Sequence, residues 1–430
     1  MKIEDVKKPL KDLVQFVSSM DLDVNEGTFD SRFPLPFRVA FIISLGIWAY
    51  ASSLHLLHLS GVDPVPILHP RRRRGLSPQG LYRPIYDIAI AVTAFTALCL
   101  AVFWGFTGGD EVAIIEWEVL PLSCFAFLAA VLFSPFNVLH QHWRYQFLSS
   151  LGRVLTGGIG RDTKFADVML ADILTSYAKV LGDLWVTGCM FLTGVSTTSK
   201  PDRACGGKYV IPLVLSIPYF IRLRQCITEY RRARDSGIWH ILNAVKYSTA
   251  FPVIILSAMQ RSYISPLEEM NPEKVWFGEV QIWRLWILAV LINSIYSFWW
   301  DVVKDWDLTI LTVDPAAPGE RLWGLRSRLH FPSKMTYYVA VVLDLCLRMT
   351  WSLKLSTHLH HLNDLEGGIF MLETVEVIRR WMWIVFRVET EWVRKGGTHS
   401  GYLPLEAIKG DLEDGEMEMG EMSGPGKYVA

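Results

Sequence analysis

Long apolar stretches separated by short polar segments run through most of the chain. Each stretch holds about 20 residues, which is the length that crosses the hydrocarbon core of a bilayer as an α-helix. We therefore expect an all-α polytopic membrane protein, built as a bundle of about nine transmembrane helices. The apolar pattern predicts these helices at 37–58, 86–107, 115–137, 168–193, 209–225, 242–262, 281–300, 335–356 and 369–388.

Composition supports the same fold class. Hydrophobic residues make up 51% of the chain and charged residues 20%, with a mean hydropathy of +0.26, whereas about 25% of residues are charged in soluble domains. Residues 1–16 (MKIEDVKKPLKDLVQF) are polar and lack the apolar core of a cleavable signal peptide. We therefore expect the first transmembrane helix to act as the signal for membrane insertion.

Charge in the predicted loops alternates along the chain. Loops 59–85, 138–166, 226–241 and 301–334 are rich in Lys and Arg, whereas 108–114 and 359–368 contain neither. Because Lys and Arg concentrate in cytosolic loops, this alternation predicts a lumenal N-terminus and a cytosolic C-terminus. The Arg71–Arg74 run has two interpretations that stay open, a topological anchor or a site for phosphoinositides or a coat component.

Cysteines and histidines give no metal-site signal. Five of the six cysteines lie in or at the ends of predicted spans and only Cys205 lies in a loop, so we expect no disulfide framework and no zinc site. His358, His360 and His361 lie in a predicted lumenal loop, which is either a solvated loop or a pH sensor. We expect no metal and no cofactor.

Enzymatic and nucleic-acid motifs are not evident either. The chain shows no Ser-His-Asp order, no nucleophile elbow and no Gly-rich phosphate loop before a helix. The Arg runs follow the predicted topology, so we expect no nucleic-acid partner. The sequence leaves the oligomeric state open.

Charged residues inside the predicted spans are the feature that needs a functional explanation. A charge at mid-bilayer costs about 2.5–3.5 kcal/mol on insertion scales, so such residues are functional candidates. Those that stand out are Asp172, Asp183, Lys246, Asp344, Arg348, Glu376, Arg379, Arg380 and Arg387, together with Asp301 and Asp305 at the end of the span 281–300.

Helical spacing groups these charges. Asp301 and Asp305 are four residues apart and share a face, as do Asp344 and Arg348. In the last span Arg379 lies beside a stripe with the spacing i, i+4, i+7 and i+11. The stripe consists of Glu376, Arg380, Trp383 and Arg387. A stripe with this charge must face the bundle interior rather than lipid.

Two interpretations of these charges stay open. They are either structural ion pairs and interfacial residues, or parts of an anion pathway. Arg387, Glu389 and Glu391, near the end of the last span, fit either interpretation. Four cations on three spans exceed the needs of one ion pair, and the guanidinium fork matches two oxygens of an oxyanion. Residue chemistry thus favours an oxyanion transporter, with Lys246, Arg348, Arg379 and Arg380 as its cations.

Long motifs that occur in order carry a family resemblance. They are KFADVMLADILTSY (164–177), IPYFIRLRQCITEYRRARD (217–235), HILNAVKYSTA (240–250), INSIYSFWWDVVKDWDL (292–308), LDLCLRMTW (343–351) and LETVEVIRRWMWIVFRVETEW (372–392). The sequence resembles the EXS family from about 36 to 395. This membrane domain is shared by the eukaryotic phosphate exporter that serves as the xenotropic retrovirus receptor and by the yeast ER-retention-defective Golgi protein.

The resemblance implies a helical transport domain that binds phosphate midway across the membrane. The implied phosphate ligands are Lys246, Arg348, Arg379 and Arg380. The implied acidic neighbours are Asp172, Asp301, Asp305 and Glu376. Tyr247, Trp351 and Trp383 are expected to shape a gate or passage, although Tyr247 has the alternative of capping backbone carbonyls near Pro252. Thr175 stands where many relatives have Asn, which puts an ancillary contact in doubt.

Only about 36 residues precede the first predicted span, too few for the SPX domain of other family members. The resemblance therefore implies the Golgi-type branch, with ER or plasma membrane as alternative locations. The implied domains are a polar N-terminal segment (1–36), three transmembrane helices (37–137), an EXS transport core (138–395) and an acidic disordered cytosolic tail (396–430).

The function implied is return of inorganic phosphate from the Golgi lumen to the cytosol, where it supports glycosylation and retention of Golgi and ER residents. The partners are then phosphate and the lipid bilayer. The alternative is a Golgi sorting adaptor, which recruits glycosyltransferases or sorting machinery through its cytosolic loops and tail. In neither case do we expect an enzyme.

Overall fold

The computed structural model describes residues 26–68, 77–108, 110–157, 164–232, 237–262, 278–311, 324–326, 328–351 and 366–396. Within these ranges the chain is helical and contains no strand, in agreement with the predicted fold class. The Arg71–Arg74 run, the histidines at 358–361 and the acidic residues 397–430 lie outside the described residues.

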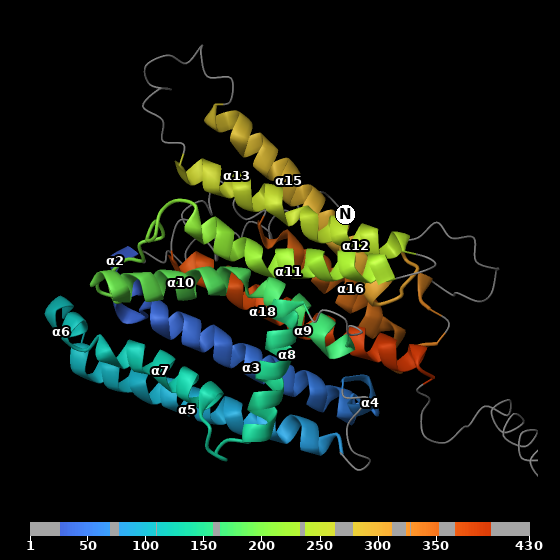
Figure 1. The fold of residues 1–430 in the computed structure, drawn as a ribbon, viewed down its shortest axis with the longest axis horizontal. Coiled ribbons are helices and arrows are strands. Elements are labelled where there is room, and N and C mark those ends of the chain that lie inside the picture. The colour runs from blue at the N-terminus through green and yellow to red at the C-terminus, as the bar shows by residue number, and fades with distance from the viewer. Residues whose placement is uncertain are drawn as a thin grey trace, which may run out of the picture.

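Three long helices form one side of the bundle. Helix α3 (Leu35–Leu59) packs against α5 (Gln79–Thr107), and both contact α7 (Val119–Phe133), in blue and cyan in Figure 1. Pro36 lies in the first turn of α3, where a residue without a backbone N–H costs no helical hydrogen bond. Four shorter helices come from the same part of the chain: α2 (Glu26–Arg32), α4 (Val65–Leu68), α6 (Glu111–Glu116) and α8 (Gln141–Thr156), of which α8 packs mainly against α9.

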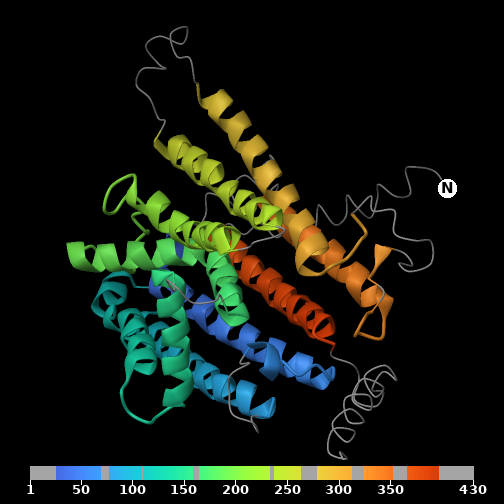
Figure 2. The same ribbon diagram turned by 45° about the vertical axis from the view of Figure 1, so that its right-hand side comes forward.

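Helix α18 (Glu366–Arg394), which carries much of the buried charge, runs through the middle of the bundle. It contacts α3, α9 and α16, and Figures 1 and 2 show it, in red, between α3 and α11. Helices α13 and α15 extend away from the bundle as a pair (Figure 2). The other helices are α9 (Phe165–Ser176), α10 (Ala178–Thr193), α11 (Val210–Arg232), α12 (Ile238–Ser248), α13 (Ala250–Ser262), α15 (Glu279–Trp300) and α16 (Lys334–Arg348).

Six of the nine predicted spans coincide with helices that are long and apolar enough to cross a membrane. These helices are Leu35–Leu59, Gln79–Thr107, Val112–Phe133, Val210–Arg232, Ile238–Gln260 and Val280–Asp305. The predicted spans 168–193, 335–356 and 369–388 fall on α9 and α10, on α16 and on α18, which carry buried charges. Membrane crossing by these helices, and the orientation of the termini, stay predictions.

The predicted span 168–193 is interrupted at Tyr177, where α9 ends before α10 begins. The Thr175 hydroxyl donates to a backbone carbonyl three residues earlier at 2.7 Å, a local bond that competes with the helical ladder. The Tyr177 side chain fills the space beside Gly46 of α3, where a Cβ atom would lie 1.6 Å from the phenol oxygen. The Tyr177 phenol therefore occupies space that a glycine in the neighbouring helix leaves open.

A short π-helix, Asp301–Asp305, continues the end of α15. The Trp306 N–H donates to the Asp301 carbonyl at 2.9 Å, the i to i−5 bond of this geometry. As the four-residue spacing predicts, the two carboxylates reach a common partner, since Asp301 lies 2.9 Å and Asp305 3.7 Å from the Lys246 ammonium group. Single-turn π-helices are frequent at functional sites.

A disulfide bond joins Cys189, near the end of α10, to Cys205. The expectation of no disulfide framework was therefore wrong. That expectation treated the loop cysteine, Cys205, as distant from the cysteines in the predicted spans. In the structure the chain after α10 folds back against this helix, so Cys205 reaches Cys189. The Trp185 indole of α10 donates to the Cys205 carbonyl at 3.3 Å, which holds the loop in place.

The loop closed by the disulfide also reaches helix α18 through Arg203. Arg203 donates to both carboxylate oxygens of Glu366, at 2.8 and 2.7 Å, and to Asp183 at 2.7 Å. Arg38 of α3 donates to Glu366 at 3.0 Å and to Asp30 of α2. These contacts bring the starts of α3 and α18 and the end of α10 to one end of the bundle, as the predicted alternation of spans requires.

Glu366 lies before the predicted span 369–388, and opposing effects act on its pKa. Burial raises the pKa of this carboxyl, but the hydrogen bonds and positive charges of Arg203 and Arg38 outweigh burial, so the pKa lies below its ordinary value of 4.5. A carboxylate whose folded-state pKa is depressed stabilises the fold above the unfolded pKa and loses this contribution as the pH falls through the folded value. At neutral pH the contribution is fully present.

We expect Glu366→Gln to lower the thermal midpoint of the purified protein at pH 7, through loss of about 2 kcal/mol of charge-assisted hydrogen bonding. The difference from wild type should shrink as the pH falls below the ordinary Glu pKa of 4.5 and through the lower pKa of the folded carboxyl. Thermal melts across pH measure this. Glu391→Gln is the control, because its partner Lys395 is 49% exposed and the pair contributes little. A difference that is constant across pH would contradict the ionic role.

Candidate anion-binding site

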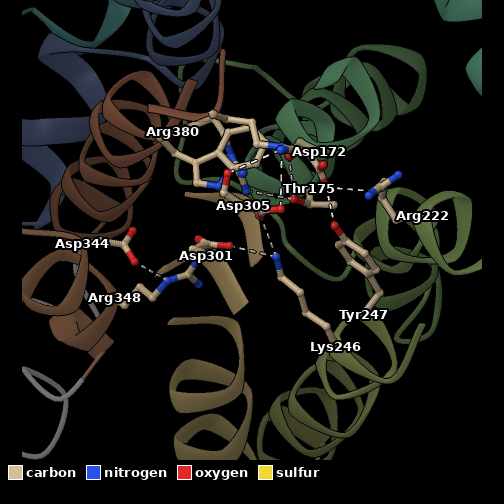
Figure 3. A network of polar contacts seen from close by, with 12 residues as sticks. Asp172, Thr175, Arg222, Lys246, Tyr247, Asp301, Asp305, Asp344, Arg348 and Arg380 are labelled. Carbon is tan, nitrogen blue, oxygen red and sulfur yellow. Dashed lines mark hydrogen bonds and ion pairs between the residues drawn. The ribbon is translucent and has the colours of Figure 1, made fainter. Parts of the chain in front are cut away.

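Charged side chains from six structural elements meet inside the bundle (Figure 3). They come from α9, α11, α12, the π-helix, α16 and α18. We call them the central cluster: Asp172, Arg222, Lys246, Asp301, Asp305, Asp344, Arg348, Glu376, Arg379 and Arg380. Because the cluster contains as many cations as carboxylates, its formal charges balance, as buried charge requires.

Asp301 is completely buried and pairs with cations from three helices. Lys246 of α12 lies 2.9 Å from one carboxylate oxygen. Arg348 of α16 donates to the other oxygen, and Arg379 of α18 lies 3.5 Å from it. Since a buried carboxylate is costly without such partners, Asp301 ties α12, α16 and α18 to the end of α15.

Arg379 and Arg348 are saturated by carboxylates. Arg379 donates to both oxygens of Glu376, at 2.9 and 2.5 Å, and to Asp344 at 3.2 Å. Arg348 donates to Asp344 at 3.1 Å, in addition to Asp301. An anion that enters here must compete with existing ion pairs at both arginines.

Asp172 of α9 accepts hydrogen bonds from Arg222 of α11, at 2.8 Å, and from the phenol of Tyr247. Arg222 also donates to Gln225 at 2.6 Å, and its guanidinium lies 4.8 Å from the centre of the Tyr247 ring. These contacts place Tyr247 beside the cluster as a partner of Asp172. They also keep Asp172 and Arg222 paired with each other.

Arg380 differs from the other arginines of the cluster because its contacts are neutral. It donates to the hydroxyls of Ser176, at 2.7 Å, and Thr175, at 3.3 Å, and its guanidinium lies 4.6 Å from the Trp383 ring centre. The residue is only 7% exposed, and among the described residues no carboxylate lies within ion-pair distance of it. This buried guanidinium is therefore available to an anionic ligand.

The two hydroxyl partners of Arg380 are the last residues of α9. They lie directly before the interruption at Tyr177, and they contact Arg380 through their side-chain hydroxyls. Ser176 also donates to Glu376 at 2.7 Å. Thr175, where an altered contact was expected, supplies its hydroxyl directly to Arg380.

Beyond Arg380 on α18 lie Trp383 and Arg387, in the order that the helical spacing predicts. The Trp383 indole is 1% exposed and donates to Asp305 at 3.3 Å. Asp305 lies between two cations, with 3.7 Å from one oxygen to Lys246 and 3.7 Å from the other to Arg387. Trp383 and Arg387 of the stripe therefore face the π-helix, whereas Glu376 and Arg380 face the end of α9.

The structure brings the predicted site residues together with one exception. Trp351 packs edge-on against Trp286 of α15, with ring centres 6.3 Å apart, and shows no contact with the central cluster among the described residues. The roles of the individual residues in holding or gating an anion stay predictions.

Sequence reasoning missed Arg222, Asp344 and Ser176 as members of the site. Arg222 was not singled out among the intramembrane charges, yet it is 2% exposed. The signal available for it was its own position as a charge inside the predicted span 209–225. Asp344 was recognised as an intramembrane charge without a site role, and Ser176 had no signal beyond its position next to Thr175.

Glu389 settles one of the alternatives left open for the end of α18. It is completely buried and accepts hydrogen bonds from Arg326, from the Tyr337 hydroxyl at 2.8 Å and from the His330 backbone N–H at 3.1 Å. These contacts make Glu389 a structural anchor rather than a free carboxylate.

The family profile for EXS matches residues 33–393. The chain belongs to the EXS family. This EXS protein is 31% identical to Protein ERD1 homolog 1 of Schizosaccharomyces pombe, over 84% of this chain and 92% of the relative. It is 28% identical to Protein ERD1 homolog 2 of the same organism, over 86% and 99%. It is 29% identical to human Solute carrier family 53 member 1, over 84% of this chain and 49% of the relative.

Substituting a charged residue that is paired with carboxylates or arginines should destabilise this EXS protein more than substituting Arg380, which has no carboxylate partner. Asp344→Asn leaves Arg348 and Arg379 short of a carboxylate, so we expect a loss of about 3–5 kcal/mol in stability. Arg380→Met leaves no carboxylate unpaired and keeps the side-chain volume, so we expect a much smaller loss. Fluorescence-detected thermal melts of the two variants test this. Equal losses would mean that Arg380 is a structural cation like its neighbours.

Proposed function

We propose that this EXS protein is a transporter of inorganic phosphate, which moves from the Golgi lumen to the cytosol through the central cluster. In this proposal Lys246, Arg348, Arg379 and Arg380 contact the anion. The carboxylates Asp172, Asp301, Asp305 and Glu376 balance the positive charge when the site is empty.

The observation that carries the proposal is the neutral surrounding of Arg380. Displacing a hydroxyl from a buried guanidinium breaks no ion pair, whereas displacing Glu376 from Arg379 would leave a carboxylate unpaired in the interior. An entering anion therefore meets the smallest cost at Arg380. The guanidinium fork then matches two oxygens of a tetrahedral oxyanion.

The hydroxyls around Arg380 suit a phosphate as well. Ser176 and Thr175 accept hydrogen bonds from Arg380 in this structure, and a hydroxyl also donates to an anionic oxygen. Glu376, whose side chain is 34% exposed, is within reach of Ser176 and offers an acceptor to a protonated phosphate oxygen. Acceptors next to cations favour phosphate over a fully deprotonated anion without a proton to donate.

Two departures from regular helix lie next to these residues, at Tyr177 and at Asp301–Asp305. In secondary transporters, substrates bind where membrane helices are interrupted, because helix ends and free backbone groups face the site. This feature supports transport, rather than catalysis, as the role of the cluster.

The Cys189–Cys205 disulfide supports the direction proposed for the bundle. Disulfide bonds persist in oxidising compartments such as the secretory lumen. We therefore assign the end of the bundle that holds Arg203 and Glu366 to the lumen, and the end of α18 at Arg394 to the cytosol. The relationship to Protein ERD1 homologs and the Golgi-type resemblance support a Golgi membrane as the location.

Phosphate flux in proteoliposomes tests the proposal. We expect wild type to transport phosphate and Arg380→Met to lose at least about 90% of this flux, because a charge-assisted hydrogen bond contributes about 1.5–3 kcal/mol. Arg380→Lys keeps the charge but not the fork and should retain an intermediate rate. Each variant is compared at equal amounts of folded protein, as judged by its thermal melt.

A chain truncated after Lys395 is the matched control, because it leaves every residue of the central cluster in place. We expect it to transport at the wild-type rate. Well-folded wild type without flux, together with a cellular requirement for the tail, would overturn the transporter and favour the sorting adaptor.

A further inference from the structure

The geometry points to Arg387 as a second oxyanion-binding subsite, which receives phosphate on the cytosolic side of a constriction formed by Trp383 and Asp305. This inference rests on the proposed function, because it extends the path of the same anion. The side chain at Arg387 is 16% exposed and lies seven residues beyond Arg380. Seven residues are two turns of helix, or about 10.5 Å, so the two guanidinium groups lie along one face of α18.

Arg387 is held by long contacts only. A guanidinium has five N–H donors, yet the hydrogen bond that Arg387 makes within the described part of the chain is a long one, 3.4 Å to the Asp305 carbonyl. Its Nε lies 3.7 Å from the Asp305 carboxylate, beyond hydrogen-bond distance. The remaining contact is with the Phe165 ring, whose centre lies 5.2 Å away. By contrast, Arg379 makes short bonds to both oxygens of one carboxylate.

Trp383 and Asp305 lie between Arg380 and Arg387. The indole packs under the Arg380 guanidinium and donates to Asp305, and the Asp305 carboxylate extends toward Arg387. An anion that leaves Arg380 along α18 therefore meets an aromatic ring and a carboxylate before it meets the next cation. Asp305 occupies the place that the anion would take beside Arg387.

An anion that leaves Arg380 can therefore move to Arg387, where it binds weakly because Asp305 competes for the same guanidinium. Conduction requires sites that bind strongly enough for entry and weakly enough for release. Asp305 competes with phosphate at Arg387. Because Asp305 also pairs with Lys246 at 3.7 Å, it keeps a cationic partner when phosphate displaces it from Arg387. Asp305 thus sets the affinity of the outer subsite.

The test measures half-saturating phosphate separately from each face of oriented proteoliposomes made with the full chain. We expect Arg387→Met to raise the cytosolic-side value about tenfold or more. The lumenal-side value should stay within about twofold, because the entry site at Arg380 is intact. Arg387→Lys should lie between wild type and Arg387→Met, which also covers the case that the methionine variant fails to fold.

Two further variants sharpen the result. Asp305→Asn removes the competing carboxylate, so the cytosolic-side value should fall, opposite in sign to Arg387→Met. Arg394→Ala is the control, because this arginine is 42% exposed and its loss should change neither value by more than about twofold.

The outcomes separate this inference from the proposed function. If Arg380→Met has no effect on flux, the proposed function fails whatever Arg387 does. If Arg387→Met changes both faces equally, or neither, the subsite is overturned while the central site stands. An anionic lipid headgroup at Arg387 would make the wild-type cytosolic value depend on phosphatidylserine in the vesicle and not on Asp305→Asn, which would also overturn the subsite.

Discussion

The carboxylate of Asp301 is the interaction on which the interior of this protein depends. It has no contact with solvent and takes partners from three helices, through Lys246, Arg348 and Arg379. Because a buried charge is tolerated only when it is paired, the helices that carry these cations have few alternative positions. The same contacts that hold the bundle together leave Arg380, the neighbour of Arg379, without a carboxylate of its own.

Two adjacent arginines on one helix therefore have opposite properties. Successive residues of a helix point about 100° apart, so Arg379 faces the acids of the π-helix and α16 while Arg380 faces the hydroxyls at the end of α9. The saturated residue stabilises the bundle, and the unsaturated one is free to change partners. Arg387, two turns later, has only long contacts with one carboxylate, Asp305, which lies between it and Arg380. The contacts of Arg380 and Arg387 are thus weaker than the carboxylate pairs of Arg379.

Much of this arrangement is predictable from local patterns. Hydropathy predicts the helices, and the spacing of Asp301 with Asp305 and of Arg380 with Trp383 predicts which side chains share a face. The fold depends in other respects on contacts between distant segments, which spacing does not encode. The partner of Asp172, Arg222, comes from 50 residues away, and spacing along the chain does not pair them. The disulfide, the π-helix and the interruption at Tyr177 were not predicted for the same reason, because local spacing does not encode contacts between distant segments.

The contact between Gly46 and Tyr177 extends the site well beyond the charges. A side chain at Gly46 would clash with the phenol of Tyr177, the residue that directly follows Thr175 and Ser176. The glycine is part of an apolar helix and touches no charged residue of the cluster. A missense allele at this codon would resemble an ordinary packing defect, yet it would act on the residue next to the hydroxyls that Arg380 contacts. Sequence variants of this protein should therefore be assessed at positions that pack behind the cluster, such as Gly46, as well as at the arginines themselves.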